Sequence, residues 1–350
     1  MTLNVNEVNE NSIQIRKAEH INVCLERDVV GNNITNGLEE FNFQHNALPE
    51  INYNEISLET NFLSKKVKTP FLVSSMTGGT SAANQINNNL AKIAEYRGWC
   101  MGVGSMRAYI EREYLSESYK IRDIAPTIPL FANLGAVQLN YGFSVKECIK
   151  AVNLISADAL VLHLNSLQEV IQPNGNTNFK NLQRKIAEIC EKLEVPVGVK
   201  EVGWGISYEV AQKLMNAGVS FIDVAGAGGT SWTKVESFRA QDPYISKLSE
   251  PFNNWGIRTA DCILNIKSKL PDTKIIGSGG IKDGVEGAKA LVLGADLVGY
   301  GRSILKPATL SMEETDETFR LIEDQLKLSM FGVGARSIDE LKKMDALFKI

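Results

Sequence analysis

Eight short apolar segments alternate with amphipathic segments from Pro70 to the end of the chain, and this alternation constrains the fold most strongly. The apolar segments are residues 71–75, 100–104, 130–133, 159–164, 197–200, 221–224, 274–278 and 297–301. Continuous apolar strands are typical of parallel sheets that are covered on both faces. Eight βα units therefore predict an α/β protein whose sheet closes as a (β/α)8 TIM barrel.

Capping signals mark several of the intervening helices. Ser144 with Glu147 predicts a capping box, and Asp283 with Glu286 repeats the pattern. The alternative fold is an open doubly wound sheet, which would need fewer strands and a GxGxxG motif after the first one. The segment 76–79 reads Met-Thr-Gly-Gly instead, which favours the closed barrel.

Two regions lie outside the regular repeat. We expect residues 1–69 to form an N-terminal extension, and residues 70–350 to hold the barrel with terminal helices from residue 312 onward. Residues 227–258 form a long connection after the sixth strand. Long loops at the C-terminal face of barrels carry lids and substrate contacts.

Composition narrows the class of protein. Hydrophobic residues make up 44% and charged residues 22% of the 350, as in soluble globular proteins. A net charge of −4 argues against a nucleic-acid partner. Residues 1–11 lack the apolar stretch of a secretory signal, and no run nears the ~20 apolar residues of a membrane span. The five cysteines show no CxxC pair, so we expect reduced, mostly packing thiols in a cytoplasmic protein with no membrane partner.

Polar chemistry is concentrated from His163 to Glu169, at the end of the fourth strand. Because side chains alternate along a strand, His163 and Asn165 point to one face. The chain then turns and presents Gln168 and Glu169 nearby. An imidazole, two amides and a carboxylate at one edge of a barrel predict a site rather than a core.

Glycine-rich segments follow the seventh and eighth strands, at residues 277–280 and 299–302. Glycines let backbone amides approach an anion, and the loops after these two barrel strands often bind phosphate. The alternative is tight turns that need small residues, but two such segments at these positions favour phosphate binding. The other strand ends carry small and polar residues that suit a flat conjugated cofactor: Ser75, Met76, Thr77, Ser105, Asn133 and Lys200.

A second anion could be held by the cations Arg16, Lys17 and Arg107 together with His20, His163 and Asn165. Alone, the Arg16–Lys17 pair would more often be a solvated surface pair. Glu169 is a candidate magnesium contact, since Mg²⁺ takes few carboxylates and keeps several waters; the alternative is an exposed glutamate at a helix start. We expect Trp232, Phe238 and Trp255 to pack rather than take part in chemistry.

Together these motifs resemble the type 2, flavin-dependent isopentenyl-diphosphate isomerases. The matching segments are residues 16–20 (RKAEH), 76–79, 104–105, 133–135, 163–169 (HLNSLQE), 200–203, 228–230 and 278–280. The RKxEH and HLNxxQE elements are specific to this family, whereas the glycine motifs are shared with other FMN barrels. One departure is Asn176, which stands where the family usually has an aspartate and leaves the Gln168–Glu169 pair intact.

The resemblance implies reduced FMN, generated with NADPH, a Mg²⁺ ion on the substrate diphosphate, and a homo-oligomer of four or eight chains. It implies that FMN contacts Ser75, Met76, Thr77, Ser105, Asn133, Lys200 and Thr230, with its phosphate on Ser278, Gly279, Gly280, Gly301 and Arg302. It implies that the diphosphate contacts Arg16, Lys17, His20, Arg107, His163 and Asn165. Gln168 would face the isoprenoid and Glu169 would hold Mg²⁺.

The implied reaction interconverts isopentenyl and dimethylallyl diphosphate by a 1,3-allylic proton transfer in isoprenoid biosynthesis. Protonating an unactivated alkene creates a tertiary cation, which needs a nearby electron-rich group. The family motifs offer no cysteine or carboxylate pair as an obvious acid. We therefore hypothesise that reduced FMN is the acid and base and that Gln168 positions the substrate rather than titrates.

Three other readings have weaker support. A 2-hydroxy-acid oxidase needs a late histidine base, and no histidine follows His163. An enzyme like inosine-monophosphate dehydrogenase needs a nucleophilic cysteine after the sixth strand, and residues 226–232 contain none. A non-catalytic flavin-binding barrel would have no use for Arg16, Lys17, Gln168 and Glu169 together.

Overall fold

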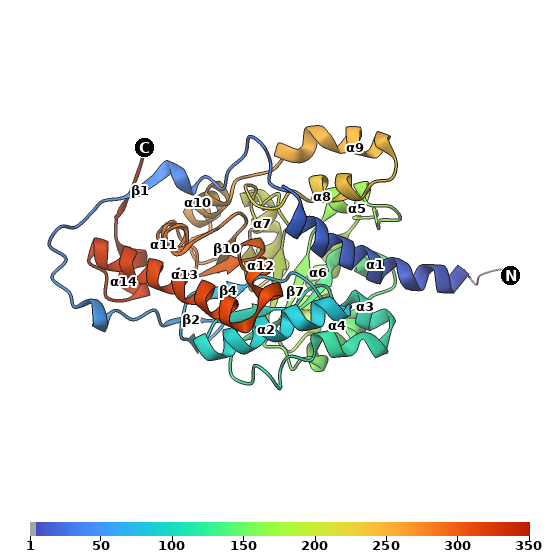
Figure 1. Cartoon of the computed structure of the whole chain (residues 1–350), viewed down its shortest axis with the longest axis horizontal. Helices are drawn as coiled ribbons and strands as arrows, with labels where there is room; N and C mark the ends of the chain where they lie inside the picture. Colours follow the sequence, from blue (N-terminus) through green and yellow to red (C-terminus); the bar gives the residue numbers. More distant parts are fainter. Residues whose placement is uncertain (1–4) are drawn as a thin grey trace.

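The computed structural model describes residues 5–350, and its centre is a closed barrel of parallel strands (Figure 1). Around the ring the order is β10-β11-β4-β5-β6-β7-β8-β9. The strands are β4 (Phe71–Val73), β5 (Cys100–Gly102), β6 (Leu130–Gly135), β7 (Ala159–His163), β8 (Val197–Lys200), β9 (Phe221–Asp223), β10 (Ile275–Ser278) and β11 (Leu297–Tyr300). The barrel prediction is confirmed. The open-sheet alternative is wrong, because β11 pairs with β4 and closes the ring.

Side chains fill the barrel interior at the N-terminal ends of its strands. Leu72, Phe131 and Phe221 point inward as part of one apolar cluster, and Phe62 joins them from outside the barrel. Phe62 belongs to a hairpin of β2 (Thr60–Phe62) and β3 (Lys65–Val67) and meets the Phe221 ring edge-on at 5.5 Å. Since aromatic side chains fill this end, the space for a ligand lies at the C-terminal ends of the strands.

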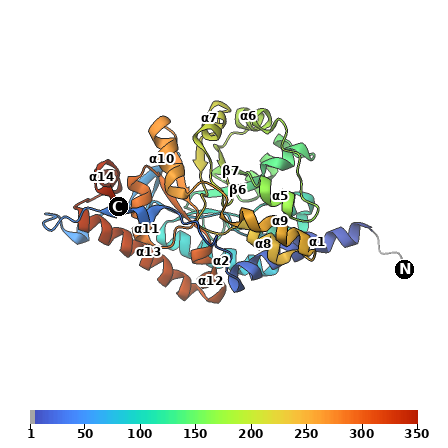
Figure 2. The same cartoon turned by 90° about the horizontal axis from the view of Figure 1, so that it is seen from above.

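Helices surround the strands, as seen from above in Figure 2. The outer helices are α2 (Ser81–Arg97), α4 (Val145–Leu154), α6 (Leu182–Lys192), α7 (Tyr208–Asn216), α10 (Thr259–Lys269), α11 (Gly284–Val292), α12 (Arg302–Leu310) and α13 (Met312–Val333). The Ser144–Glu147 capping box is confirmed. At α11 only half of the pattern forms: Asp283 caps the helix, but the Glu286 carboxylate accepts from the Lys282 amide and the Asn36 side chain.

Short helical elements follow several strands at the C-terminal end of the barrel. They are α3 (Arg107–Glu111), η3 (Glu113–Tyr119), η4 (Ala136–Asn140) and α5 (Ser166–Ile171). The long connection 227–258 is largely helical, with α8 (Trp232–Arg239), α9 (Pro243–Ser249) and η5 (Glu250–Asn254), and α8 packs against α5.

The N-terminal region is tied to both ends of the fold. Helix α1 (Val5–Glu26) packs against α8, and after η1 (Leu38–Glu40) strand β1 (Phe41–Phe43) pairs with the C-terminal strand β12 (Leu347–Lys349). Helix η2 (Tyr53–Glu55) then packs against α13, and α14 (Ile338–Lys343) precedes β12. The C-terminal region is therefore not helical throughout, and the division of the chain at residue 69 stays a prediction. Among residues 5–350 no helix has the length and apolar character to cross a membrane.

Candidate functional site

A cavity of about 580 Å³ opens at the C-terminal ends of the barrel strands, within the range of small-molecule and cofactor sites. All the site residues predicted from sequence line it, from α1, from the strand ends and from the loops that follow them: Arg16, Lys17, His20, Ser75, Met76, Thr77, Ser105, Arg107, Asn133, His163, Asn165, Gln168, Glu169, Lys200, Thr230, Ser278, Gly279, Gly280, Gly301 and Arg302. The structure brings these residues together, while the role of each stays a prediction.

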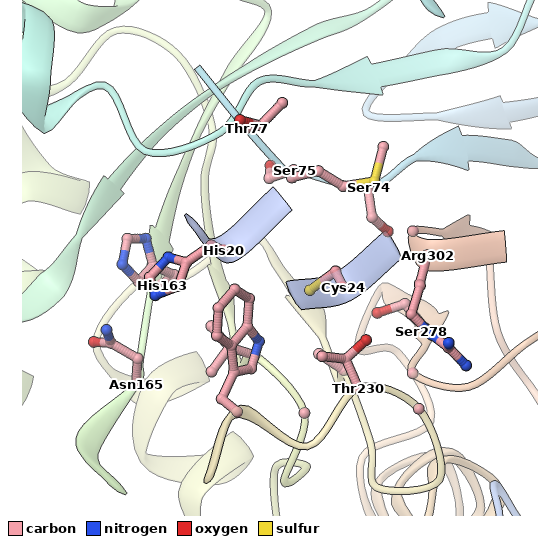
Figure 3. Close-up of a pocket in the computed structure, with 18 of the residues that line it drawn as sticks. His20, Cys24, Ser74, Ser75, Thr77, His163, Asn165, Thr230, Ser278 and Arg302 are labelled. Carbon is pink, nitrogen blue, oxygen red and sulfur yellow. The ribbon is translucent and has the colours of Figure 1, made fainter. Parts of the chain in front are cut away.

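Two groups of residues lie at opposite sides of this cavity. Figure 3 shows Ser278 and Arg302 on one side and His163 with Asn165 on the other. Between them runs the part of α1 that carries His20 and Cys24. A ligand that reached both groups would therefore lie beneath α1.

The loop after β10 is shaped by close backbone contacts. A Cβ atom at Gly279 would lie 2.2 Å from the carbonyl oxygen of Gly226, and one at Gly280 would lie 2.5 Å from that of Gly228. Both glycines have positive φ, at 104° and 74°. The Thr259 hydroxyl donates to the Gly279 carbonyl oxygen at 2.6 Å and holds the loop from behind. Only glycine fits here, and the resulting turn faces the cavity.

The residues at this side fit FMN. Ser74 Oγ is buried and has no hydrogen-bond partner among residues 5–350, although Ser74 lines the cavity. A Cβ at Gly301 would meet nothing within 4 Å, so this residue faces open space where α12 begins. A helix N-terminus beside glycine turns suits a phosphate group. An unsatisfied hydroxyl along the wall suits a ring heteroatom.

Lys200 sits at the floor of the cavity in a buried polar cluster. Its Nζ donates to the carbonyl oxygen of Glu201 at 2.9 Å and lies 3.7 Å from Asp223 Oδ2. Asp223 Oδ1 accepts a hydrogen bond from Ser278 Oγ at 2.5 Å. This chain of contacts links the ends of β8, β9 and β10 and fixes the lysine that is expected to reach the flavin ring.

Lys17 enters the cavity from α1 with its ammonium group already held. Its Nζ donates to the carbonyl oxygen of Ser105 at 3.0 Å and to the hydroxyl of Tyr119 at 2.8 Å. Burial, together with the charges of Arg16 and Arg107, lowers the pKa of Lys17 to about 7. Three cations crowded in this way are costly without an anion, which indicates that a bound anion would stabilise this end of the cavity.

A buried carboxylate that the sequence did not reveal organises His20 and Gln168. Glu236 Oε1 lies 2.9 Å from His20 Nε2 and accepts from Gln168 Nε2 at 3.1 Å, while Glu236 Oε2 accepts from Arg239 Nη1 at 2.5 Å. Burial would raise the pKa of Glu236, but the His20 hydrogen bond and the Arg239 charge hold it below its usual value. Glu236 therefore fixes which way the Gln168 amide points.

His163 is held at the end of β7. Its Nδ1 lies 2.8 Å from Asn133 Oδ1, and burial, reinforced by the charges of Lys200 and Lys17, lowers its pKa to about 4. The ring is therefore neutral at pH 7. With Nδ1 donating to Asn133, the other ring nitrogen is an acceptor. Binding an anion through it would require protonation, or a turned Asn133 amide that lets Nε2 carry the proton.

Glu169 is buried and satisfied by amide donors. Its Oε1 accepts from Asn165 Nδ2 at 2.9 Å, and its Oε2 accepts from Gln172 Nε2 at 2.9 Å and from the Asn176 amide at 2.5 Å. The exposed-glutamate alternative is therefore wrong. No group of three His, Cys, Asp or Glu side chains suited to a metal occurs within residues 5–350. A Mg²⁺ ion at Glu169 would need its other ligands from water and the substrate, which fits the ion's preference.

Several cavity residues were missed or misjudged from sequence. Cys24 lines the cavity rather than only packing, and Trp232 lines it with its ring edge-on to His20 at 5.1 Å. Phe238 and Trp255 are 49% and 59% exposed and are not among the described residues that line this cavity. That the three aromatic residues pack rather than take part in chemistry stays a prediction. The amides Gln138 and Gln172 also line the cavity. Their only sequence signal was their place just after a strand or helix at the C-terminal end of the barrel.

Comparison with known proteins gives the family of the chain. Residues 140–347 match the FMN-dependent dehydrogenase family. The chain is 52% identical to the isopentenyl-diphosphate delta-isomerase of Oceanobacillus iheyensis, over 95% of each chain. It is 45% identical to the protein of that name from Nostoc sp., over 96% of each chain.

Solved structures with the same fold are more distant. A lactate oxidase of Pediococcus acidilactici matches with a TM-score of 0.70 at 18% identity, covering 100% of this chain and 96% of that one. A flavocytochrome b2 matches at 0.67 and 19%, covering 94% and 82%. These two show the fold alone. The relatives of high identity, read with the family match, decide the assignment: the chain belongs to the type 2, FMN-dependent isopentenyl-diphosphate delta-isomerase family.

Proposed function

We propose that this chain interconverts isopentenyl diphosphate and dimethylallyl diphosphate by a 1,3-allylic proton transfer, using reduced FMN. The observation that carries the proposal is one cavity lined both by the glycines Gly279 and Gly280 and by the cations Arg16, Lys17 and Arg107. The glycines follow β10, whereas Lys17 contacts Ser105 after β5 and Arg107 contacts Asn176 after α5, across the barrel from β10. Such a cavity can hold a flavin phosphate and a substrate diphosphate at once. An oxidation of 2-hydroxy acids is disfavoured, because no histidine follows His163 in the chain.

In this proposal the chain's own residues bind, orient and exclude water. Lys17, Arg16 and Arg107 attract the diphosphate, and Glu169 would offer a carboxylate to Mg²⁺, which would help to neutralise the diphosphate charge. Gln168 is only 8% exposed and is held by Glu236, so its amide faces the cavity in a fixed orientation. Trp232 and Ile21 give part of the wall an apolar character that suits a hydrocarbon chain.

FMN, when bound and reduced, supplies the proton carrier and the electron-rich surface that this reaction requires. We propose NADPH as the reductant. We also propose a homo-oligomer of four or eight chains, which follows from the family resemblance. A cytoplasmic location is proposed because the five cysteines are free thiols, as expected in a reducing compartment.

Replacing Gln168 with alanine is expected to lower kcat roughly 10- to 100-fold, the usual cost of losing a group that orients the reacting atoms. FMN binding should be unchanged, and so should the shape of the pH profile, because the amide positions the substrate and does not titrate. The check is steady-state kinetics with flavin absorbance, with Gln212→Ala on the exposed face of α7 as control. Full activity in Gln168→Ala would contradict the assigned role.

The function itself is tested anaerobically in D₂O. The purified protein is incubated with FMN, NADPH, Mg²⁺ and isopentenyl diphosphate, and dimethylallyl diphosphate is analysed for deuterium by mass spectrometry. The proposal predicts deuterated product that disappears when NADPH is omitted and the flavin stays oxidised. A flavin that binds and is reduced normally but yields no product would overturn it.

A further inference from the structure

The loop after α5 makes contacts that the proposed function leaves unused. They lie at the diphosphate side of the cavity, the side lined by the cations Arg16, Lys17 and Arg107. Asn176 Oδ1 accepts hydrogen bonds from Arg107 Nη1 at 2.9 Å and from Gln138 Nε2 at 3.1 Å. The backbone amide of Asn176 donates to Glu169 Oε2 at 2.5 Å. One residue thus holds both a cation expected to bind the diphosphate and the carboxylate expected to bind the metal.

The loop is built to bring Asn176 to this place. The Gly175 amide donates to the carbonyl oxygen of Gln172 at 3.2 Å and closes a turn. A Cβ at Gly175 would lie 1.8 Å from the carbonyl oxygen of Glu169, so only glycine lets the loop lie this close to α5. Asn174 adopts a φ of 57°, a conformation that asparagine tolerates better than most residues.

We propose that Asn176 is a positioning residue for the diphosphate, orienting Arg107 through its side chain and Glu169 through its backbone amide. The inference rests on the proposed function, because it assumes a diphosphate bound with Mg²⁺. The side chain of Asn176 is neutral, so it directs the guanidinium without cancelling its charge. Arg107 also has a charged partner, Glu111, which accepts from Arg107 Nε at 2.6 Å one turn further along α3.

The two contacts of Asn176 can be separated by substitution. Asn176→Ala removes the acceptor for Arg107 and Gln138 but keeps the backbone amide on Glu169. Asn176→Asp keeps an acceptor of the same shape but adds a negative charge between Arg107 and Glu169. The aspartate should therefore restore the orientation of Arg107, yet repel an anion unless Mg²⁺ compensates the charge.

The test measures binding of inorganic pyrophosphate to the oxidised, FMN-loaded protein by calorimetry, at limiting and saturating Mg²⁺. Loss of a hydrogen bond to a charged group predicts roughly tenfold weaker binding for Asn176→Ala at both Mg²⁺ levels. The Mg²⁺ midpoint and melting temperature of this variant should stay those of the native protein. Asn176→Asp should bind like the native protein at saturating Mg²⁺ and more weakly at limiting Mg²⁺.

Thr177→Ala is the matched control, because Thr177 is the next residue and is exposed. In turnover, Asn176→Ala should raise the KM for isopentenyl diphosphate about tenfold, with kcat within about twofold of the native value. Native affinity for pyrophosphate in Asn176→Ala, or an equal loss in Thr177→Ala, would overturn the positioning role alone. A native protein that binds no pyrophosphate would overturn the proposed function and this inference together.

Discussion

Replacing Gly279 with alanine is expected to abolish FMN binding, so that the protein is purified colourless. The new Cβ would lie 2.2 Å from the carbonyl oxygen and 2.4 Å from the amide nitrogen of Gly226. Backbone cannot give way as a flexible side chain can, so the loop after β10 must move. A positive φ of 104° adds further strain for any residue with a side chain. A displaced loop no longer presents its backbone to a phosphate, and we expect an FMN affinity at least about 100-fold lower.

Two further glycine variants separate cofactor binding from folding. Gly332→Ala is the control, because a Cβ there meets nothing within 4 Å on the surface helix α13. Gly301→Ala also meets no protein atom within 4 Å, yet Gly301 lines the cavity. Its apoprotein should keep most of its stability while FMN affinity falls. Titration of each apoprotein with FMN, followed by fluorescence quenching, checks all three variants. Native FMN affinity in Gly279→Ala would contradict the assignment of the loop after β10 to phosphate binding.

The strand ends were predictable because topology places them together. Once eight parallel strands are recognised, their C-terminal ends must lie on one face, so Ser75, Asn133 and Ser278 could be grouped without a structure. The Lys17 segment could be suggested as part of an anion site from its charges and was supported by family resemblance, but nothing in residues 1–69 states where α1 lies. The packing of Phe62 against the barrel interior could not be predicted from the sequence, because each strand of its hairpin has only three residues.

Glu236 illustrates what sequence reasoning could not reach. It lies in α8, and its partner His20 is 216 residues away in the chain. A lone glutamate in a helix with charged neighbours reads as solvent-facing, yet this one is 1% exposed. Its burial arises only when α1 and α5 both pack on α8. Contacts of this kind depend on three elements that meet in space, and local pattern carries no trace of them.

Replacing Lys17 with methionine is expected to have opposite effects on activity and on stability. The ammonium group is one of three cations at the diphosphate side, so its loss should lower kcat/KM by roughly 100-fold or more, as for other buried charge-assisted contacts. The folded apoprotein, however, carries this charge at a cost, because burial and the charges of Arg16 and Arg107 lower the pKa of Lys17 from 10.5 to about 7. Methionine removes that cost.

The direction of the pH dependence follows from this lowered pKa. Between pH 7 and 10.5 the unfolded chain holds the Lys17 proton and the folded chain does not, so the free energy of unfolding contributed by this group rises with pH across that window. Below pH 7 both states hold the proton, so the full cost of burying the charged ammonium group lowers the free energy of unfolding. The free energy of unfolding of the Lys17→Met apoprotein should therefore exceed that of the native apoprotein by about 1–3 kcal/mol below pH 7. This difference should fade toward pH 10.5.

Activity provides the second measurement of the same proton. Because kcat/KM reports ionisations of the free enzyme, the ratio of native to Lys17→Met kcat/KM should be greatest below pH 7 and fall above it, as Lys17 loses its charge. Taking the ratio cancels the titration of the substrate diphosphate. Urea unfolding of the apoproteins from pH 6 to 10 measures the predicted difference in free energy of unfolding, with Lys146→Met at an exposed position as control. A pH-independent ratio together with a destabilised Lys17→Met variant would contradict both the cost of burying this charge and its role in holding the anion.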